Sequence, residues 1–346
     1  MMYRLSPRLG YTIGVFFETS VCQLVAVDLS DQPLAERTIP LSLPARLVAG
    51  EIVEVIAGEV RTLRADPRVS GRGALAVGVA APGMVDTGEG VWLHGLRLSG
   101  IEQVPLRTAL EQAVAAPVLL EDEARCLAHL EAGRLGTAQG SDLLLLYLGS
   151  GVGAGLVLGG ELYRGHRGLA GEVGHLVVED RGDRCPCGNA GCLETVASVP
   201  AVIRRIQRRL QEGVFSSLRA AGEARGLTIE HIRRAAESGD RLALASIAEI
   251  GRAIGDACGK TIMILNPGTL CIGGPVAALG DFLREPVWAR IREQVMPEML
   301  KALTVRYAPY HAGDEALGAA LLASRWFWAG LKPGTAADLL GTAAAD

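Results

Sequence analysis

Blocks of apolar residues separated by short polar breaks divide the first part of the chain into predicted strands and a helix. Residues 11–17 and 21–29 are rich in β-branched and aromatic side chains, which is typical of strands. A turn at Asp31-Gln32-Pro33 indicates that the second strand folds back into a third, over residues 35–41. Residues 53–63 then have the spacing of an amphipathic helix. The chain is therefore predicted to open with a β-meander followed by a helix.

A similar succession of elements returns in the middle of the chain. An apolar run at 74–81, which ends in Pro82-Gly83, predicts a strand buried on both faces. After two predicted helices, at 106–115 and around Leu127 and Leu130, three further strands are expected, at residues 143–148, 154–158 and 161–164. Two successive modules of strands followed by helices predict a duplicated α/β architecture with a ligand cleft between two lobes.

The composition fits a folded protein of this kind. The chain has 346 residues, 49% of them hydrophobic, which is long for one compact core. A formal net charge of -4 and a pI near 5.9 disfavour autonomous nucleic-acid binding, because such surfaces are normally basic. The uncharged stretch 143–160 is long enough to span a membrane, but its glycines break it into strand, loop and strand. Since the N-terminus lacks a signal-peptide pattern, we expect a soluble, cytoplasmic protein without membrane contact.

One histidine and three cysteines in a short stretch predict a metal site. The candidate ligands are His175, Cys185, Cys187 and Cys192. One imidazole and three thiolates are a donor set typical of tetrahedral zinc. A disulfide is disfavoured in a chain without a signal peptide, and core cysteines are usually flanked by apolar residues. Because four protein ligands leave no open position, the zinc is expected to hold a loop in place and not to activate water.

Two glycine-rich segments are candidates for a phosphate or nucleotide site. The candidate residues are Gly149, Ser150, Gly151, Gly153, Gly273 and Gly274. In the first segment, glycines would let backbone amides converge on an anion. That segment opens a strand, whereas a dinucleotide-binding fingerprint opens a helix, so a Rossmann site is disfavoured. For the first segment, phosphate binding and simple tight turning stay equally open, and for Gly273-Gly274 ligand binding and close packing do.

A run of arginines lies on a predicted helix near residue 205. Its members are Arg204, Arg205, Arg208 and Arg209, and the apolar residues of the helix share another face. Such a run could bind phosphate. On an amphipathic helix it is more often a solvated face, and we favour that interpretation.

Taken together, several motifs closely resemble those of the ROK family of repressors, open reading frames and sugar kinases. They are Leu148–Gly155, Leu162–Gly165, Gly171–His175, Cys185–Glu194, Leu265–Pro267 and Ile272–Gly274. The resemblance spans about residues 10 to 325 and is most specific at 171–194. It implies a two-lobed, actin-like and ribonuclease-H-like α/β fold, commonly dimeric, with sugar and nucleotide in the cleft between the lobes.

The resemblance also suggests domain boundaries and sugar ligands. We expect an N-terminal α/β lobe over residues 10–122, joined by a helix near 314–330, and a C-terminal lobe over 123–313 that carries the zinc loop. The small, polar and alanine-rich residues 331–346 are expected to form a flexible tail. Glu172 and Glu194 would accept hydrogen bonds from sugar hydroxyls, and His175 would join the zinc site to the sugar pocket. Each glutamate could instead be a carboxylate at the N-terminus of a helix.

Three departures from the family's kinase pattern concern phosphate transfer. Kinases of the family open with Asp-x-Gly-x-Thr, whereas residues 16–20 here have an aromatic residue at the acid position and Glu18 at the glycine position. The general-base position aligns with Glu123, with Asp122 as the alternative base. The sugar-contacting asparagine aligns with Arg97, and the tryptophan that follows it in the family is lost.

These departures favour a sugar-sensing protein of the repressor-type, kinase-degenerate branch, without kinase activity. Residues 1–9 leave no room for the winged helix of the family's repressors, so we expect no DNA-binding domain in this chain. Arg97 and Arg125 favour a phosphorylated or acidic sugar over a neutral one, although Arg125 could instead pair with Asp122 or Glu121. The expected partners are a monosaccharide or sugar phosphate and a second copy of the chain.

Two other functions stay open. One is an ATP-dependent hexose or N-acylhexosamine kinase, which would need ATP and Mg²⁺ and would use Glu123 or Asp122 as its base. The other is a zinc-stabilised interaction protein without a small ligand. Sugar binding and sugar phosphorylation by the purified protein would separate the three functions.

Overall fold

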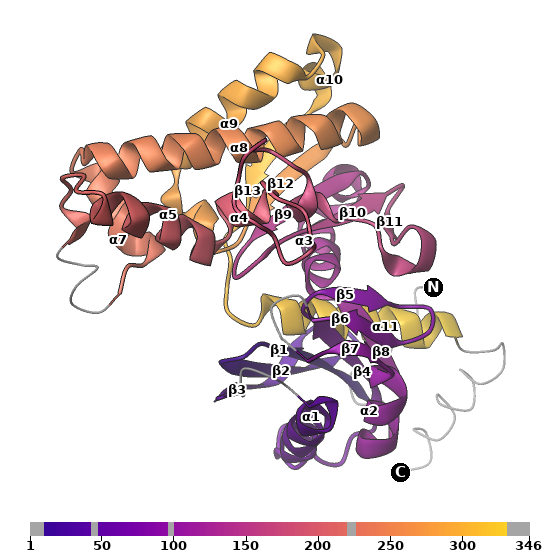
Figure 1. Cartoon of the computed structure of the whole chain (residues 1–346). Coiled ribbons are helices and arrows are strands. Elements are labelled where there is room, and N and C mark those ends of the chain that lie inside the picture. The colour runs from indigo at the N-terminus through magenta and orange to yellow at the C-terminus, as the bar shows by residue number, and fades with distance from the viewer. Residues whose placement is uncertain (1–9, 43–47, 96–99, 220–225, 331–346) are drawn as a thin grey trace. The chain divides into compact units, whose positions relative to one another are not determined.

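The computed structural model describes residues 10–42, 48–95, 100–219 and 226–330. Two predicted features, Arg97 and the tail 331–346, lie outside these ranges. The described chain divides into two compact units (Figure 1), each treated separately below. Unit 1 contains the residues up to Leu130, the segment Arg164–Ala170 and the residues from His311 onward. Unit 2 contains Glu131–Tyr163 and Gly171–Tyr310.

Unit 1 is built on a five-stranded sheet with the order β3-β2-β1-β4-β8. Its strands are β1 (Tyr11–Phe17), β2 (Val21–Asp28), β3 (Pro33–Pro40), β4 (Ala74–Ala81) and β8 (Val118–Asp122). The first three strands pair antiparallel, and β4 and β8 continue the sheet in parallel pairing with β1 and with each other. The predicted opening β-meander and the buried strand at 74–81 are confirmed.

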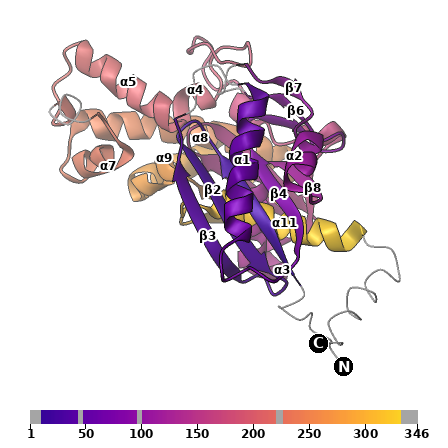
Figure 2. The same ribbon diagram turned by 90° about the horizontal axis from the view of Figure 1, so that it is seen from below.

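Helices cover both faces of this sheet (Figures 1 and 2). α1 (Ala49–Arg64) and α2 (Leu106–Val114) pack against each other, and α11 (Asp314–Gly330) packs on β1 and β4 from the other side. A Cβ at Gly14 in β1 would lie 1.7 Å from the carbonyl oxygen of Ala316 in α11. Only glycine lets the helix approach the strand this closely.

A small antiparallel sheet follows β4 and closes one end of unit 1. It contains β5 (Met84–Asp86), β6 (Val91–His94) and β7 (Glu102–Val104). Trp92 in β6 is fully buried, and its ring meets that of Phe17 edge-on with 5.3 Å between the centroids. Its indole N–H donates a 2.8 Å hydrogen bond to the carbonyl of Pro82. The C-terminal end of β1 is thereby packed with aromatic side chains.

Unit 2 repeats the same sheet plan, with the order β11-β10-β9-β12-β13. Its strands are β9 (Leu143–Leu148), β10 (Val152–Leu158), β11 (Glu161–Tyr163), β12 (Thr269–Gly273) and β13 (Thr304–Tyr307). Here too an antiparallel meander is extended by two strands in parallel pairing. The expected duplicated, two-lobed α/β fold of actin-like proteins is confirmed by this repetition.

Helices make up most of the rest of unit 2. They are α3 (Glu123–Gly140), which begins in unit 1, α4 (Glu194–Ala197), α5 (Val199–Gln211), α7 (Ile229–Glu237), α8 (Arg241–Leu265), α9 (Asp281–Gln294) and α10 (Pro297–Ala302). α8 presents Gly251, Gly255 and Gly259 to α9, and a Cβ at Gly255 would lie 2.6 Å from the carbonyl oxygen of Val287. Among the described residues, none of the helices is both long and apolar enough to cross a membrane.

Candidate functional site

The four predicted metal ligands come together in unit 2. The ligand atoms of His175, Cys185, Cys187 and Cys192 all lie within 4.8 Å of one another. Nδ1 of His175 is 3.4 Å from Sγ of Cys185, and Sγ of Cys187 is 3.6 Å from Sγ of Cys192. One imidazole and three thiols at these separations fit a zinc ion, which would take all four as ligands and stabilise the loop. With no open position, such a metal would hold the fold and leave chemistry to other residues.

A tight turn sets the spacing of the cysteines. The amide of Cys185 donates to the carbonyl of Asn189 at 2.8 Å, and the amide of Gly188 donates to the carbonyl of Cys185 at 3.0 Å. Gly188 adopts a φ of 97°, a left-handed conformation that favours glycine. Cys185 and Cys187 therefore stand on one side of a turn that the sequence Cys-Pro-Cys-Gly-Asn can form locally.

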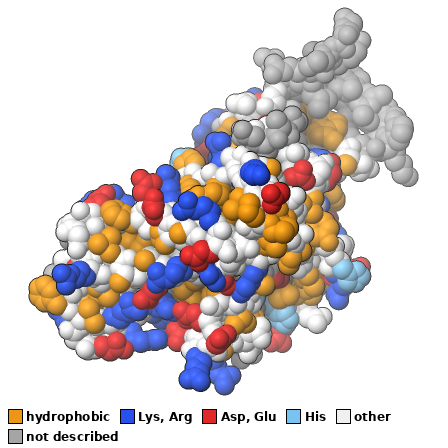
Figure 3. Space-filling view, turned by 90° about the horizontal axis from the view of Figure 1, so that it is seen from above, with side chains coloured by type: hydrophobic (Ala, Val, Ile, Leu, Met, Phe, Trp, Pro, Cys, Tyr) orange, Lys and Arg blue, Asp and Glu red, His pale blue; other side chains and the backbone are white. Residues whose placement is uncertain are grey.

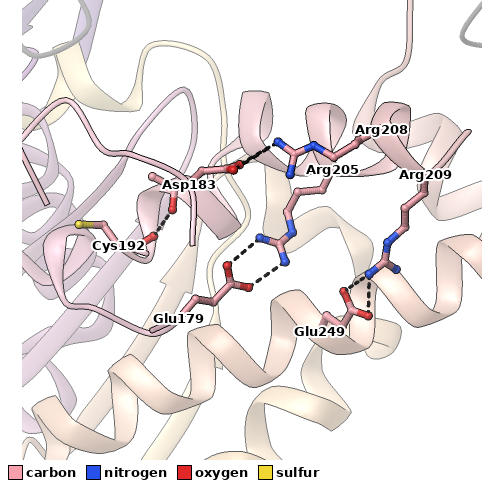
Figure 4. Close-up of polar contacts among 8 residues, drawn as sticks. Glu179, Asp183, Cys192, Arg205, Arg208, Arg209 and Glu249 are labelled. Atoms are coloured by element: carbon pink, nitrogen blue, oxygen red, sulfur yellow. Dashed lines mark hydrogen bonds and ion pairs between the residues drawn. The ribbon is translucent and has the colours of Figure 1, made fainter. Parts of the chain in front are cut away.

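Two arginines of α5 hold the same loop by ion pairs, and a third pairs with α8 (Figure 4). Arg205 makes a bidentate contact with Glu179, with distances of 2.8 and 3.0 Å. Arg208 approaches Asp183 at 3.2 Å, and Arg209 pairs with Glu249 of α8 at 2.7 Å. On the face drawn in Figure 3, basic and acidic side chains are intermingled. The arginine run is thus largely ion-paired and needs no phosphate to balance its charge.

The predicted sugar residues lie around this loop and contact one another or the same strand. Oε2 of Glu172 is 3.7 Å from Nε2 of His175, whose other ring nitrogen faces Cys185. Glu194, the first residue of α4, accepts a 3.0 Å hydrogen bond from the amide of Val152. A Cβ at Gly174 would lie 2.0 Å from the carbonyl oxygen of Val152, so the loop also packs directly on β10. The half-exposed Glu172 carboxylate therefore stands on a loop fixed from several sides.

Close packing accounts for part of the two glycine-rich segments. Gly149 begins the turn between β9 and β10, and its amide donates to the carbonyl of Gly151 at 2.9 Å. A Cβ at Gly149 would lie 2.5 Å from the ring of Tyr147. At Gly274, a Cβ would lie 2.7 Å from the carbonyl oxygen of Leu148. Phosphate binding by the remaining residues, Ser150, Gly151, Gly153 and Gly273, stays a prediction.

The residues aligned with the catalytic motif form a buried ion cluster in unit 1. Glu121 is 1% exposed and Arg125 is 2% exposed. The Glu121 carboxylate accepts from Nε of Arg125 through Oε1 and from Nε of Arg164 through Oε2, both at 2.7 Å. Nη1 of Arg125 donates to the carbonyl of Ala170 at 3.0 Å. Arg125 thus pairs with Glu121, one of the two partners that the sequence offered.

The two candidate bases lie next to each other at the start of α3. Asp122 caps α3, because its Oδ1 accepts from the amides of Ala124 at 2.9 Å and Arg125 at 3.1 Å. Burial raises the pKa of the Asp122 carboxyl, while the nearby Arg125 guanidinium acts in the opposite direction. Glu123 begins α3 and is 5% exposed.

The β1–β2 connection carries residues that, by the resemblance to the family, align with its phosphate loop. The amide of Glu18 donates to the carbonyl of Val21 at 2.8 Å, which closes a tight hairpin. The turn residues Glu18, Thr19 and Ser20 include no glycine and none has a positive φ. Phe16, which aligns by the same resemblance with the acid of that loop, is 4% exposed.

One element of the site was not anticipated from the sequence. The segment Arg164–Ala170 belongs to unit 1, although the residues on both sides of it belong to unit 2. Arg167 in its middle pairs with the 2% exposed Asp86 at 2.9 Å. Two arginines and two glycines between residues 164 and 168 were the available signal for this segment, but their partners are distant in the sequence.

Known proteins are similar to this chain along most of its length. The family model described as "ROK family" matches residues 21–325. A glucokinase of Thermotoga maritima is 34% identical over 253 residues, which cover 72% of this chain and 79% of the relative.

Solved structures give a similar result. A ROK family transcriptional regulator, a homolog of the E. coli MLC protein, has a TM-score of 0.82 at 25% identity, covering 94% of this chain and 80% of that chain. A ROK family glucokinase from Streptomyces griseus, solved with glucose and AMPPNP, has a TM-score of 0.75 at 29% identity, covering 91% of this chain and 100% of that chain. Since the family model matches most of the sequence, this chain belongs to the ROK family.

Proposed function

We propose that this protein is a sugar-sensing ROK protein that binds a monosaccharide at its zinc loop and does not phosphorylate it. The observation that carries the proposal is the β1–β2 turn. Its closed hairpin lacks the glycines of the family's phosphate loop, and Phe16 replaces the acid. A nucleoside triphosphate would therefore lack both the glycine backbone that contacts its phosphates and the first carboxylate of the kinase motif.

Electrostatics oppose nucleotide binding at the same place. If the Glu18 carboxylate lay about 4 Å from a phosphate oxygen, it would disfavour binding by roughly 4 kcal/mol per unit charge at an effective dielectric of about 20. The base position adds a second obstacle, because Glu123 is longer than aspartate by one methylene. A displacement of about 1 Å at a reacting group can lower a rate on the order of 100-fold. Both effects act on phosphate transfer and neither acts on sugar binding.

Sugar recognition is supported by the loop that carries Glu172, His175 and Glu194. Carboxylates on a fixed loop can accept hydroxyl hydrogen bonds at a small cost in ordering entropy. The Streptomyces griseus relative was solved with glucose, so glucose is the first ligand to test. Since Arg125 is already paired with Glu121, the reason for preferring a sugar phosphate now rests on Arg97 alone.

Calorimetry on the zinc-loaded protein tests the proposal. The panel contains glucose, N-acetylglucosamine and glucose 6-phosphate, with Glu172→Gln as the variant and Arg209→Gln as a control distant from the loop carboxylates. We expect one monosaccharide to bind to the unmodified protein and to the control, and to bind far more weakly to Glu172→Gln. If none of the three binds, the zinc-stabilised interaction protein becomes the better description.

A second candidate is an ATP-dependent hexose or N-acylhexosamine kinase with bound Mg²⁺. The 34% identity to the Thermotoga maritima glucokinase favours it. Coupled ADP release with a hexose panel separates it from the first candidate, because robust turnover by the unmodified chain contradicts the non-kinase proposal. Assembly as a homodimer, a cytoplasmic location and the absence of autonomous nucleic-acid binding are further predictions of the proposed function.

A further inference from the structure

Residues Arg164–Ala170, called here the bridging segment, are tied to unit 1 at both ends and in the middle. Arg164 donates to Glu121 at 2.7 Å, and the carbonyl of Ala170 accepts from Arg125 at 3.0 Å. In the middle, Arg167 donates to Asp86 at 2.9 Å. Gly168 packs so closely that a Cβ there would lie 2.7 Å from Oγ1 of Thr87. The segment is therefore held as part of unit 1.

The contact between Glu121 and its two arginines is the strongest of these ties. The carboxylate is almost fully buried and both of its oxygens accept from guanidinium groups. Charge-assisted hydrogen bonds of this kind are short and strongly directional. Arg125 is the shared member, because it binds Glu121 through Nε and Ala170 through Nη1. A lysine has one compact charge and cannot reproduce both contacts.

A single residue separates the end of the bridging segment from Glu172, whose carboxylate lies on the zinc loop. Ala170 is held by Arg125, Gly171 follows, and Glu172 comes next. Gly171 has a φ of 99°, and a Cβ there would lie 2.2 Å from the carbonyl oxygen of Ala154 in β10. The connecting residue is thus confined to one conformation, which links the position of Ala170 to that of Glu172.

We propose that Arg125 is a positioning residue for Glu172. The side chain stands in the motif that family kinases use for phosphate transfer, and in this protein it fixes the bridging segment and, through Gly171, the carboxylate of the zinc loop. Occupancy of the loop by a sugar and the state of the buried cluster in unit 1 are consequently coupled. The role of Glu172 as a sugar ligand rests on the proposed function, whereas the fixation of the segment does not.

Hydrogen exchange of the full-length, zinc-loaded protein tests this inference without any sugar. In Arg125→Lys we expect amide exchange across residues 164–175 to rise by about tenfold, because the segment opens locally. Exchange at 185–192 and the zinc content should stay as in the unmodified protein. The control Arg209→Gln removes an arginine ion pair of unit 2 and should leave 164–175 unchanged. Arg164→Gln, at a half-exposed position, provides a second variant should Arg125→Lys fold poorly.

The outcomes distinguish this inference from the proposed function. Unchanged exchange at 164–175 in the folded variants overturns the positioning role, whether or not a sugar binds. If glucose or N-acetylglucosamine binds, its dissociation constant should rise about tenfold in Arg125→Lys, since Glu172 is no longer held in place. Faster exchange with an unaltered dissociation constant would overturn the coupling. If no sugar binds, the proposed function is wrong. The exchange result alone then tests whether Arg125 fixes the bridging segment.

Discussion

Replacing Arg205 by alanine should weaken the hold of α5 on the zinc loop. The Arg205 guanidinium meets the Glu179 carboxylate through two hydrogen bonds, and the two side chains are 22% and 32% exposed. Exposed ion pairs contribute about 0–1 kcal/mol, whereas hydrogen bonds to charged groups reach about 1.5–3 kcal/mol. For this partly buried, bidentate pair we expect a loss of about 1.5 kcal/mol.

The same helix supplies a matched control. Arg208 meets Asp183 on the same loop at 3.2 Å, but the two side chains are 57% and 36% exposed. Solvent screens this pair, so Arg208→Ala should cost only about 0.3 kcal/mol. Each variant removes one arginine side chain from α5. The two ion pairs that are lost differ in burial and geometry.

Urea unfolding and competition with a zinc chelator measure the two effects. We expect Arg205→Ala to lower the free energy of unfolding by the larger amount and to weaken zinc binding by up to about tenfold, since about 1.4 kcal/mol corresponds to a factor of ten. Glu179→Ala and the double variant complete a cycle that isolates the pair energy. Equal losses for Arg205→Ala and Arg208→Ala, or a coupling energy near zero, would refute the argument from burial.

Three further outcomes are expected. Cys187→Ser should remove a thiolate ligand, so elemental analysis should detect far less than one zinc per chain and thermal unfolding should occur at a lower temperature. Glu172→Gln keeps the shape of the side chain but weakens its hydrogen bonds to hydroxyls, and calorimetry should show at least about a tenfold loss of sugar affinity. Glu123→Asp alone should give no ADP release in the coupled assay, because the β1–β2 turn still excludes phosphate. Any gain should require its combination with changes in that turn, namely Phe16→Asp, Glu18→Gly and Ser20→Thr.

Features that depend on neighbouring residues could be predicted from the sequence. The clustering of His175 with three cysteines is an example, because Cys185 and Cys187 are placed by a local turn around Gly188. The strand blocks were similarly local, and their repetition predicted the duplicated fold. In each case the pattern and its structural consequence lie within a few residues of each other.

Features that depend on distant partners could not be predicted in the same way. Arg125 donates to the carbonyl of Ala170, which is 45 positions away along the chain, and only the folded bridging segment brings these two residues together. The hydrogen bond from Val152 to Glu194 joins residues 42 positions apart. By contrast, Glu121 lies only four residues from Arg125, and it was one of the two partners that the sequence offered.

The packing of α11 on β1 bears on the order in which the chain folds during synthesis. Thr12 in β1 donates through Oγ1 to the carbonyl of Ala320 in α11 at 3.0 Å, and Gly14 lies directly beneath the same helix. During synthesis, α11 is made after all of unit 2. The packing of β1, the first strand of unit 1, can therefore be completed only then. All residues of unit 2 are made before α11, so we expect unit 2 to fold first, which reverses the usual N-terminal-first order of domains. Until α11 emerges, the glycine-lined face of β1 and β4 stays open to other chains and to chaperones.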